Sequence, residues 1–428
     1  MSEARPSLRQ RLRSVALGSQ LGPGLITGAA DDDPSGIATY SQAGAQFGFG
    51  LLWTMVLTFP LMAAIQMVSA HIGRVTGRGL ASNMAQVMPK GVVGVLVTLL
   101  FIANTINLGA DLAAMGQAAA LVAGVGRHAF TIAFAVVSVL LQMFVPYKRY
   151  ARLLTVLTLS LLAYVAVVFI IHLDWSVVGW SMLGVGATLT PAAATVIVAI
   201  FGTTISPYLF FWQSSEEVEE INQSGHRKPL VEEPAQAKRA FSRIRIDTLV
   251  GMAVSNLVAL AIMISTAATL HAHGKTDIQT AADAARALEP VAGKFAFLLF
   301  SLGIVGTGLL AIPVLAGSTA YAVCETRGWK LGLDNKPWEA VGFYTIIAAA
   351  VGFGLVIDYS GLDPIKALYW SAVVNGLIAV PMMAAMMIVA TSKKKMGDFT
   401  AGPALRILGW TSTAVMAAAA VAMVVTSV

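Results

Sequence analysis

Cysteine is nearly absent from this sequence: Cys324 is the only one among 428 residues. A single cysteine excludes both an intrachain disulfide and a metal site built from several cysteines. Charged residues are also scarce, at 12% of the chain, whereas soluble domains carry about 25%. The sequence contains no HExxH, GxSxG or Walker motif, which argues against a hydrolytic enzyme and a self-contained ATP-driven pump. We therefore expect a protein that is not an enzyme and that needs no cofactor.

Long hydrophobic runs are what the chain has in abundance, since apolar residues make up 57% of it. A run of ~20 apolar residues is long enough to cross the hydrocarbon core of a bilayer as a helix. The sequence therefore predicts an all-α integral membrane protein, with a single transmembrane domain over residues 1–428. We expect eleven spans, at residues 22–46, 50–73, 92–124, 128–147, 150–173, 191–217, 244–270, 289–323, 338–357, 363–391 and 403–427.

The basic residues are divided unevenly between the two sides of the membrane. Of the 28 lysines and arginines, 23 fall in segments on the side of the N-terminus and 5 on the other. The positive-inside rule then predicts a multi-pass protein of the inner (plasma) membrane, with its N-terminus in the cytoplasm and its C-terminus outside. The net charge of +6 reflects this orientation, so the expected partner is the lipid bilayer and not nucleic acid. No obligatory protein partner is expected.

Three consecutive acids interrupt the first predicted span, where Asp31, Asp32 and Asp33 precede Pro34. A charged residue at bilayer depth costs at least ~2.5–3.5 kcal/mol on insertion scales, so such residues usually line an ion or substrate path. Proline and the nearby Gly36 favour a break in the helix, which leaves backbone carbonyls free. Carboxylates and carbonyls together form an oxygen-rich site, which suits a divalent cation.

A second break is predicted in the sixth span, where residues 202–208 combine small polar residues with Pro207. Interrupted helices at corresponding positions of two repeats point to a transport site near the bilayer midplane. We expect one five-helix repeat at 22–173, an inverted second repeat at 191–391, and an extra helix at 403–427. This division rests on the topology and on the position of the breaks.

The candidate ligands of this site come from the two breaks and from the tenth span: Asp33, Ser206, Thr203, Asp32, Asp31, Ser35, Gly36, Tyr208 and Asn375. Asp33 is expected to bind the ion directly or through water, and its alternative role is to cap the helix after the break. Consecutive residues on a helix point ~100° apart. Asp31 and Asp32 therefore line the cavity only where the backbone unwinds, and otherwise they pair elsewhere.

For the second break, the Ser206 hydroxyl and the Thr203 carbonyl are the expected ligands. The alternative is that Ser206 bonds to the backbone of its own helix. Tyr208 either bonds a water in the cavity or packs at the interface between helices. Asn375 either faces the site or makes an interhelical hydrogen bond.

A polar stripe runs along one face of the third span, at Asn104, Asn107 and Asp111. At spacings i, i+3 and i+7, these residues must face protein or water and not lipid. They either flank the path of the ion or anchor the scaffold, and we favour the scaffold.

Several motifs resemble the NRAMP family of divalent-metal transporters, and the resemblance covers most of the chain. They are Gly22-Pro23-Gly24, Asp33-Pro34, the block 42–48, the block 74–78 and Pro207. The resemblance implies the LeuT-like fold of two inverted five-helix repeats, and it implies a metal-binding carboxylate at Asp33.

The departures from the family's motifs are informative. The family's span-1 asparagine is replaced by Gly36, and its Met-Pro-His becomes Ser206-Pro207-Tyr208. The family's next span-6 histidine aligns with Gln213, and its span-3 glutamate, which is tied to proton movement, aligns with Ala114. A thioether ligand, which favours soft metals, is thus replaced by a hydroxyl.

This pattern resembles the NRAMP-related magnesium transporters. It implies that the transported substrate is Mg2+, with Mn2+ also accepted, and that uptake is driven by the membrane potential without proton coupling. The alternative is a proton-coupled Mn2+/Fe2+ transporter of the ordinary NRAMP type. A further alternative is an organic-solute symporter on the same fold, although the triple aspartate repels a carboxylated substrate.

Overall fold

The computed structural model describes residues 22–124, 126–146, 154, 156–187, 189–224 and 227–427, and every regular element in these ranges is a helix. The helices of the first half are α2 (Pro23–Asp31), α3 (Pro34–Phe47), α4 (Trp53–Thr76), α5 (Leu80–Val87), α6 (Lys90–Ala123), α7 (Arg127–Phe144), α9 (Leu162–Ile170) and α10 (Trp175–Met182). The long helices of the second half are α11 (Pro191–Thr204), α12 (Pro207–Ser224), α13 (Ala237–Thr269), α16 (Ala296–Arg327), α17 (Val341–Asp358), α18 (Pro364–Thr391) and α20 (Pro403–Ser427). The short helices α14 (Ala281–Ala285), α15 (Glu289–Ala292) and α19 (Lys393–Met396) connect them.

Nine stretches of the described residues are long and apolar enough to cross a bilayer. The first predicted span is not among them because the stretch from α2 to α3 contains three adjacent acids, Asp31, Asp32 and Asp33, and neither α2 nor α3 is long enough to cross alone. The fifth is represented by the shorter apolar stretch Val156–Ile170, and residues 150–153 and 155 of that prediction lie outside the described residues. The count of eleven spans therefore stays a prediction, as does the division into repeats at 22–173 and 191–391 with a helix at 403–427.

Both predicted helix breaks are present, and proline forms the first turn after each of them. The first helix stops at Asp31 and restarts at Pro34, while the second stops at Thr204 and restarts at Pro207. Proline suits this position because the first turn of a helix does not use its backbone N–H groups. Each break thus leaves two or fewer residues in a non-helical conformation at the middle of a span.

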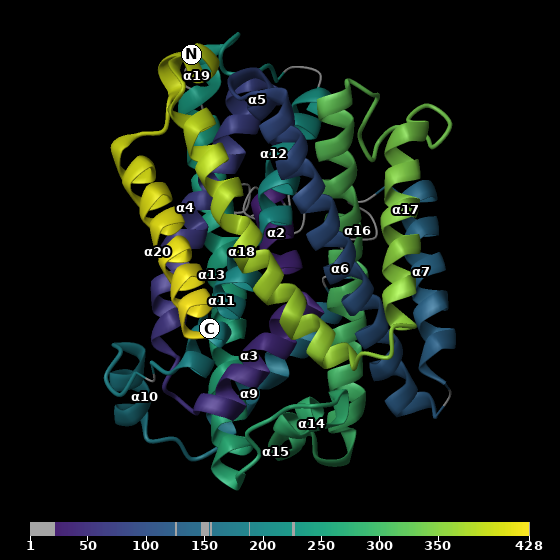
Figure 1. Cartoon of the computed structure of the whole chain (residues 1–428), viewed down its shortest axis with the longest axis vertical. Coiled ribbons are helices and arrows are strands. Elements are labelled where there is room, and N and C mark those ends of the chain that lie inside the picture. Colours follow the sequence, from purple (N-terminus) through teal and green to yellow (C-terminus); the bar gives the residue numbers. More distant parts are fainter. Residues whose placement is uncertain are drawn as a thin grey trace, which may run out of the picture.

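The broken helices lie at the centre of the molecule, where Figure 1 shows α2 and α12 surrounded by α4, α6, α13, α16 and α18. The stretch Pro191–Ser224 is almost wholly buried, whereas Arg127–Phe144 and Pro403–Thr426 expose most of their residues. In Figure 1, α7 and α17 lie together at one edge, and α20 packs beside α18 at the other. Exposed apolar residues on the outer helices suit contact with lipid, so the polar breaks are shielded from it.

Glycine allows two pairs of central helices to approach closely. A Cβ atom at Gly28 of α2 would collide with the backbone of Gly251 in α13, and one at Gly202 of α11 would collide with Gly376 in α18. Such contacts between backbones are typical of membrane helix packing, where small residues replace the hydrophobic driving force available in water. These contacts hold both breaks against their neighbours.

Candidate metal-ion site

Asp33 lies at the first break and is held from several directions. It is the N-cap of α3, and its Oδ1 accepts hydrogen bonds from the Ser35 hydroxyl at 2.7 Å and the Gly36 amide at 2.8 Å. Its Oδ2 accepts from the Asn107 side-chain amide at 2.9 Å, and the Tyr208 hydroxyl lies 3.4 Å away. The capping role therefore occupies Oδ1. Oδ2 is the less tightly bonded of the two carboxylate oxygens.

The second break meets the first through hydroxyl groups. The Thr203 hydroxyl lies 3.4 Å from that of Ser35. Tyr208 donates to the Ala30 carbonyl at 3.1 Å, at the end of α2. The Ser206 hydroxyl is 2.7 Å from the carbonyls of both Gly202 and Thr203, so in this structure it bonds to its own helix. The roles of Ser206 and the Thr203 carbonyl as ligands stay predictions.

Asp31 and Asp32 turn toward a different helix. The Ser255 hydroxyl of α13 lies 2.6 Å from Asp31 Oδ2 and 3.0 Å from Asp32 Oδ1. A hydroxyl has one hydrogen, so it donates to only one of the two carboxylates at a time. Asp31 Oδ1 has no hydrogen bond within the described part of the chain. The break thus separates Asp33 from its two neighbours, whose place as ligands of the same ion stays a prediction.

Asn375 is buried in α18 with no hydrogen bond from either of its amide atoms to any described residue. Ser371 lies one helical turn before it and donates to Asn107 Oδ1 at 2.7 Å. Because residues four apart share a helix face, Asn375 is on the side of α18 that meets α6 near Asp33. These contacts do not test its predicted role as a ligand, which stays a prediction.

The polar stripe of the third span divides into two parts. Asn104 donates to Leu315, Ser318 and Thr319 of α16, as expected of a residue that anchors the scaffold. Asn107 instead bonds Asp33 directly and lies 3.4 Å from Asp111 Oδ2. The scaffold role expected for Asn107 stays a prediction, because a hydrogen bond to Asp33 is compatible with either alternative. The polar stripe is visible in the sequence, but the sequence does not indicate that Asn107 is the partner of Asp33.

Two other contacts at the breaks have no signal in the sequence. Ser255 is one of three serines in the long helix α13, and nothing local connects it to Asp31 and Asp32. Gln213 accepts a hydrogen bond from Thr27, while its side-chain nitrogen has no partner in the described ranges. Both pairs join residues about half a chain apart, so only the fold brings them together.

The acids near the breaks have no basic partner in the part of the chain that the structure describes. Asp31, Asp32, Asp33 and Asp111 are buried, and none of them belongs to an ion pair in the described ranges. A buried charge without a partner is strongly unfavourable. No three histidine, cysteine or acidic side chains converge as a metal cluster among the described residues. The arrangement instead suits an ion held by one carboxylate, by neutral oxygens and by retained water.

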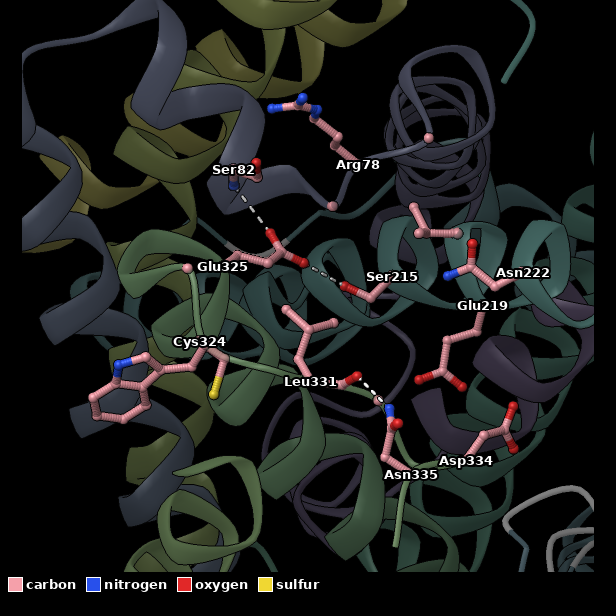
Figure 2. Close-up of a pocket in the computed structure, with 16 residues that line it drawn as sticks. Arg78, Ser82, Ser215, Glu219, Asn222, Cys324, Glu325, Leu331, Asp334 and Asn335 are labelled. Carbon is pink, nitrogen blue, oxygen red and sulfur yellow. Dashed lines mark hydrogen bonds between the residues drawn. The ribbon is translucent and has the colours of Figure 1, made fainter. Parts of the chain in front are cut away.

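A separate cavity of about 350 Å³ lies where α5, α12 and α16 meet. Figure 2 shows Glu325 between Ser82 and Ser215, and its carboxylate accepts a hydrogen bond of 3.0 Å from each. Glu219 also lines this cavity, ~16 Å along α12 from Tyr208 at 1.5 Å per residue. The cavity is therefore distinct from the site at the breaks, and it lies on the predicted cytoplasmic side.

Comparisons with known proteins agree with this geometry. The family described as Natural resistance-associated macrophage protein-like (Nramp) matches residues 24–426. The divalent metal cation transporter MntH of Klebsiella pneumoniae (strain 342) is 28% identical over 424 residues, which cover 97% of this chain and 95% of that protein. The MntH protein of Pectobacterium carotovorum is 28% identical over 406 residues, covering 93% and 91%.

Solved structures share the fold. A manganese transporter of Eremococcus coleocola, crystallised with an aromatic bis-isothiourea substituted compound, superimposes with a TM-score of 0.76 at 15% identity, over 98% of this chain and 88% of that one. Mhp1, a nucleobase-cation-symport-1 family transporter in a closed conformation, gives 0.60 at 14% identity, over 95% and 93%. These likenesses confirm the predicted all-helical, LeuT-like fold class.

Proposed function

Because the chain belongs to the Nramp family, we propose that it carries divalent metal ions across the plasma membrane, with Mg2+ preferred and Mn2+ also accepted. The observation that carries this proposal is the buried, unpaired carboxylate of Asp33, at the point where the two helix breaks meet. The ion binds there between α2/α3 and α11/α12. Asp33 Oδ2 is its anionic ligand.

The chemistry of the neighbouring groups supports Mg2+. The side chains that hydrogen-bond to Asp33 are a hydroxyl, an amide and a phenol, from Ser35, Asn107 and Tyr208. Hydroxyl and amide oxygens suit hard cations, while thioether and imidazole favour softer transition metals. Mg2+ releases its water reluctantly and is usually held by one or two carboxylates with several waters.

Uptake in this proposal is driven by the membrane potential alone. A divalent cation that enters a cell gains ~4.6 kcal/mol per 100 mV of inside-negative potential, twice the value for a single charge. Gln213 and Ala114 occupy the positions that the family resemblance connects with proton movement, and neither side chain titrates near neutral pH. This supports transport without a coupled proton.

The second candidate is a proton-coupled Mn2+ transporter of the ordinary type. The names of the relatives, which are divalent metal cation and manganese transporters, favour Mn2+ as the substrate. An organic-solute symporter has less support, since the likeness to Mhp1 concerns the fold only. The acids at the first break also favour a cation as the substrate.

The experiment is uptake by purified protein in proteoliposomes, with Mg2+, Mn2+ or Ca2+ outside and a pH reporter inside. We expect Mg2+ and Mn2+ uptake under an inside-negative potential, without internal acidification. Asp33→Ala abolishes this uptake. Asp174→Ala, which removes an exposed carboxylate that caps α10, leaves it unchanged. Mn2+ entry accompanied by protons, with Mg2+ excluded, would return the chain to the ordinary proton-coupled type.

A further inference from the structure

We propose that Asn107 is an oxygen ligand of the transported cation and that its side-chain amide turns over when the ion binds. In this structure its nitrogen donates to Asp33. In the loaded site its Oδ1 faces the ion. This inference rests on the proposed function, because it concerns the same site and the same class of substrate, a divalent cation that prefers oxygen ligands.

The position of the amide nitrogen is the first observation. Asn107 Nδ2 lies 2.9 Å from Asp33 Oδ2 and 3.4 Å from Asp111 Oδ2, so it stands between two buried carboxylates. A point between two carboxylates without a basic partner is where a cation is most strongly attracted. A metal ion at ~2.1 Å from Asp33 Oδ2 on this side would face the amide N–H, which carries partial positive charge. The N–H must therefore turn away, and rotation about the last side-chain bond brings Oδ1 into its place.

The far end of the amide can accommodate both orientations. The Ser371 hydroxyl is 2.7 Å from Asn107 Oδ1 and also 2.7 Å from the Leu368 carbonyl. In the orientation that the structure shows, Ser371 donates its hydrogen to Asn107. After the amide has turned, Ser371 accepts a hydrogen bond from Nδ2 and donates to Leu368. Because a hydroxyl both donates and accepts, neither orientation leaves a buried group unpaired there, and the cation decides between them.

Asn104, one turn earlier on α6, has no such freedom. Its nitrogen donates to the Leu315 carbonyl and to the hydroxyls of Ser318 and Thr319, at 2.8–3.2 Å. Both hydroxyls lie within 3.0 Å of the Leu315 carbonyl as donors. Turning this amide would bring its oxygen against that carbonyl. Asn104 therefore serves as a matched control, a buried asparagine on the same helix whose amide is fixed.

The test counts the water molecules bound to Mn2+ in the purified full-length protein, by pulsed electron paramagnetic resonance in heavy water. In Asn107→Ala a water takes the place of the lost ligand, so we expect one more bound water than in the wild type and roughly tenfold weaker Mn2+ affinity. Asn107→Asp keeps an oxygen at this position and is expected to keep the wild-type water count. Asn104→Ala leaves both the water count and the affinity unchanged.

The outcomes separate this inference from the proposed function. Suppose that Mn2+ binding depends on Asp33 but that Asn107→Ala has the wild-type water count. Asn107 then only donates a hydrogen bond to Asp33, so this inference is overturned while the proposed function stands. If Mn2+ binding is the same in the wild type and in Asp33→Ala, the proposed site and this inference both fail. Size-exclusion profiles like that of the wild type verify that each variant is folded.

Discussion

Asn375 shows at the scale of one residue how a buried polar group can be costly for stability. Its side-chain nitrogen and oxygen both lack hydrogen bonds to the described residues, although the residue is 1% exposed. An unsatisfied buried polar group costs about 1–3 kcal/mol. A group retained at such a cost suggests a use outside the protein's own hydrogen bonding. A hydrated ion at the neighbouring site would supply the missing partners.

We therefore predict that Asn375→Leu stabilises the protein by roughly 1–3 kcal/mol and reduces uptake of divalent cations. Leucine fills a similar volume and leaves no polar atom without a partner. Thermal unfolding in detergent and uptake by proteoliposomes measure the two effects. A variant that is destabilised and transports normally would show that Asn375 is an ordinary structural residue.

The residues at the site differ in how far the sequence could predict them. The acids and proline of the first break are a local signal, because each is unfavourable inside an apolar helix, and the resemblance to the family's Asp-Pro motif then singles out Asp33 among the three acids. Asn107 and Ser255 could not be assigned, because their contacts with the break join distant segments. A polar residue on an apolar helix predicts that a partner exists, and only the packing of the helices identifies it.

At the scale of an element, the short helix α2 depends on its neighbour α13. Gly22 precedes the helix and has no side chain that could cap it. The Asp247 carboxylate of α13 supplies the cap instead, and it accepts from the backbone amides of Gly24 at 2.7 Å and Leu25 at 3.3 Å. A carboxylate at a helix N-terminus also interacts favourably with the helix dipole. One end of α2 is thus held by α13, and the other end is the first break.

This arrangement predicts that Asp247→Ala destabilises the protein by about 1–2 kcal/mol, toward the upper part of the range for lost N-caps. Asp174→Ala is the control, since Asp174 caps the exposed helix α10 from within the same segment. We expect a smaller effect there, because water can replace the lost hydrogen bonds. Thermal unfolding of both variants measures the difference. Equal losses of stability would contradict a special role for the contact between α2 and α13.

The positions of the helices were easier to predict than which helices pack against each other. The apolar runs and the two prolines predict the helices and both breaks, because membrane helices are determined by local composition. The close packing of α2 on α13 depends on Gly28 and Gly251 lying opposite each other. Glycines are frequent in this sequence, so their presence did not indicate which of them meet.

At the scale of the whole molecule, placement in a membrane explains both which residues are buried and where the basic residues lie. The polar breaks lie at the centre and the helices α7 and α20 lie on the outside (Figure 1), where both expose apolar residues. Most basic residues lie on one predicted side, 23 of 28. In the predicted orientation, an inside-negative potential retains these charges in the cytoplasm, and in the proposed function the same potential draws divalent cations inward. The orientation of the protein and the direction of transport are therefore linked.

The orientation can be tested with single cysteines in a background that carries Cys324→Ser. We expect Ser360→Cys, between α17 and α18, and Thr426→Cys, near the end of α20, to react with a membrane-impermeant maleimide on intact cells. Lys394→Cys, in the short helix α19, is expected to react only after the cells are permeabilised. All three positions are exposed or lie at a helix end, so access depends on the side of the membrane. Labelling of Lys394→Cys but not Thr426→Cys on intact cells would reverse the predicted topology, and with it the argument that the basic segments face the cytoplasm.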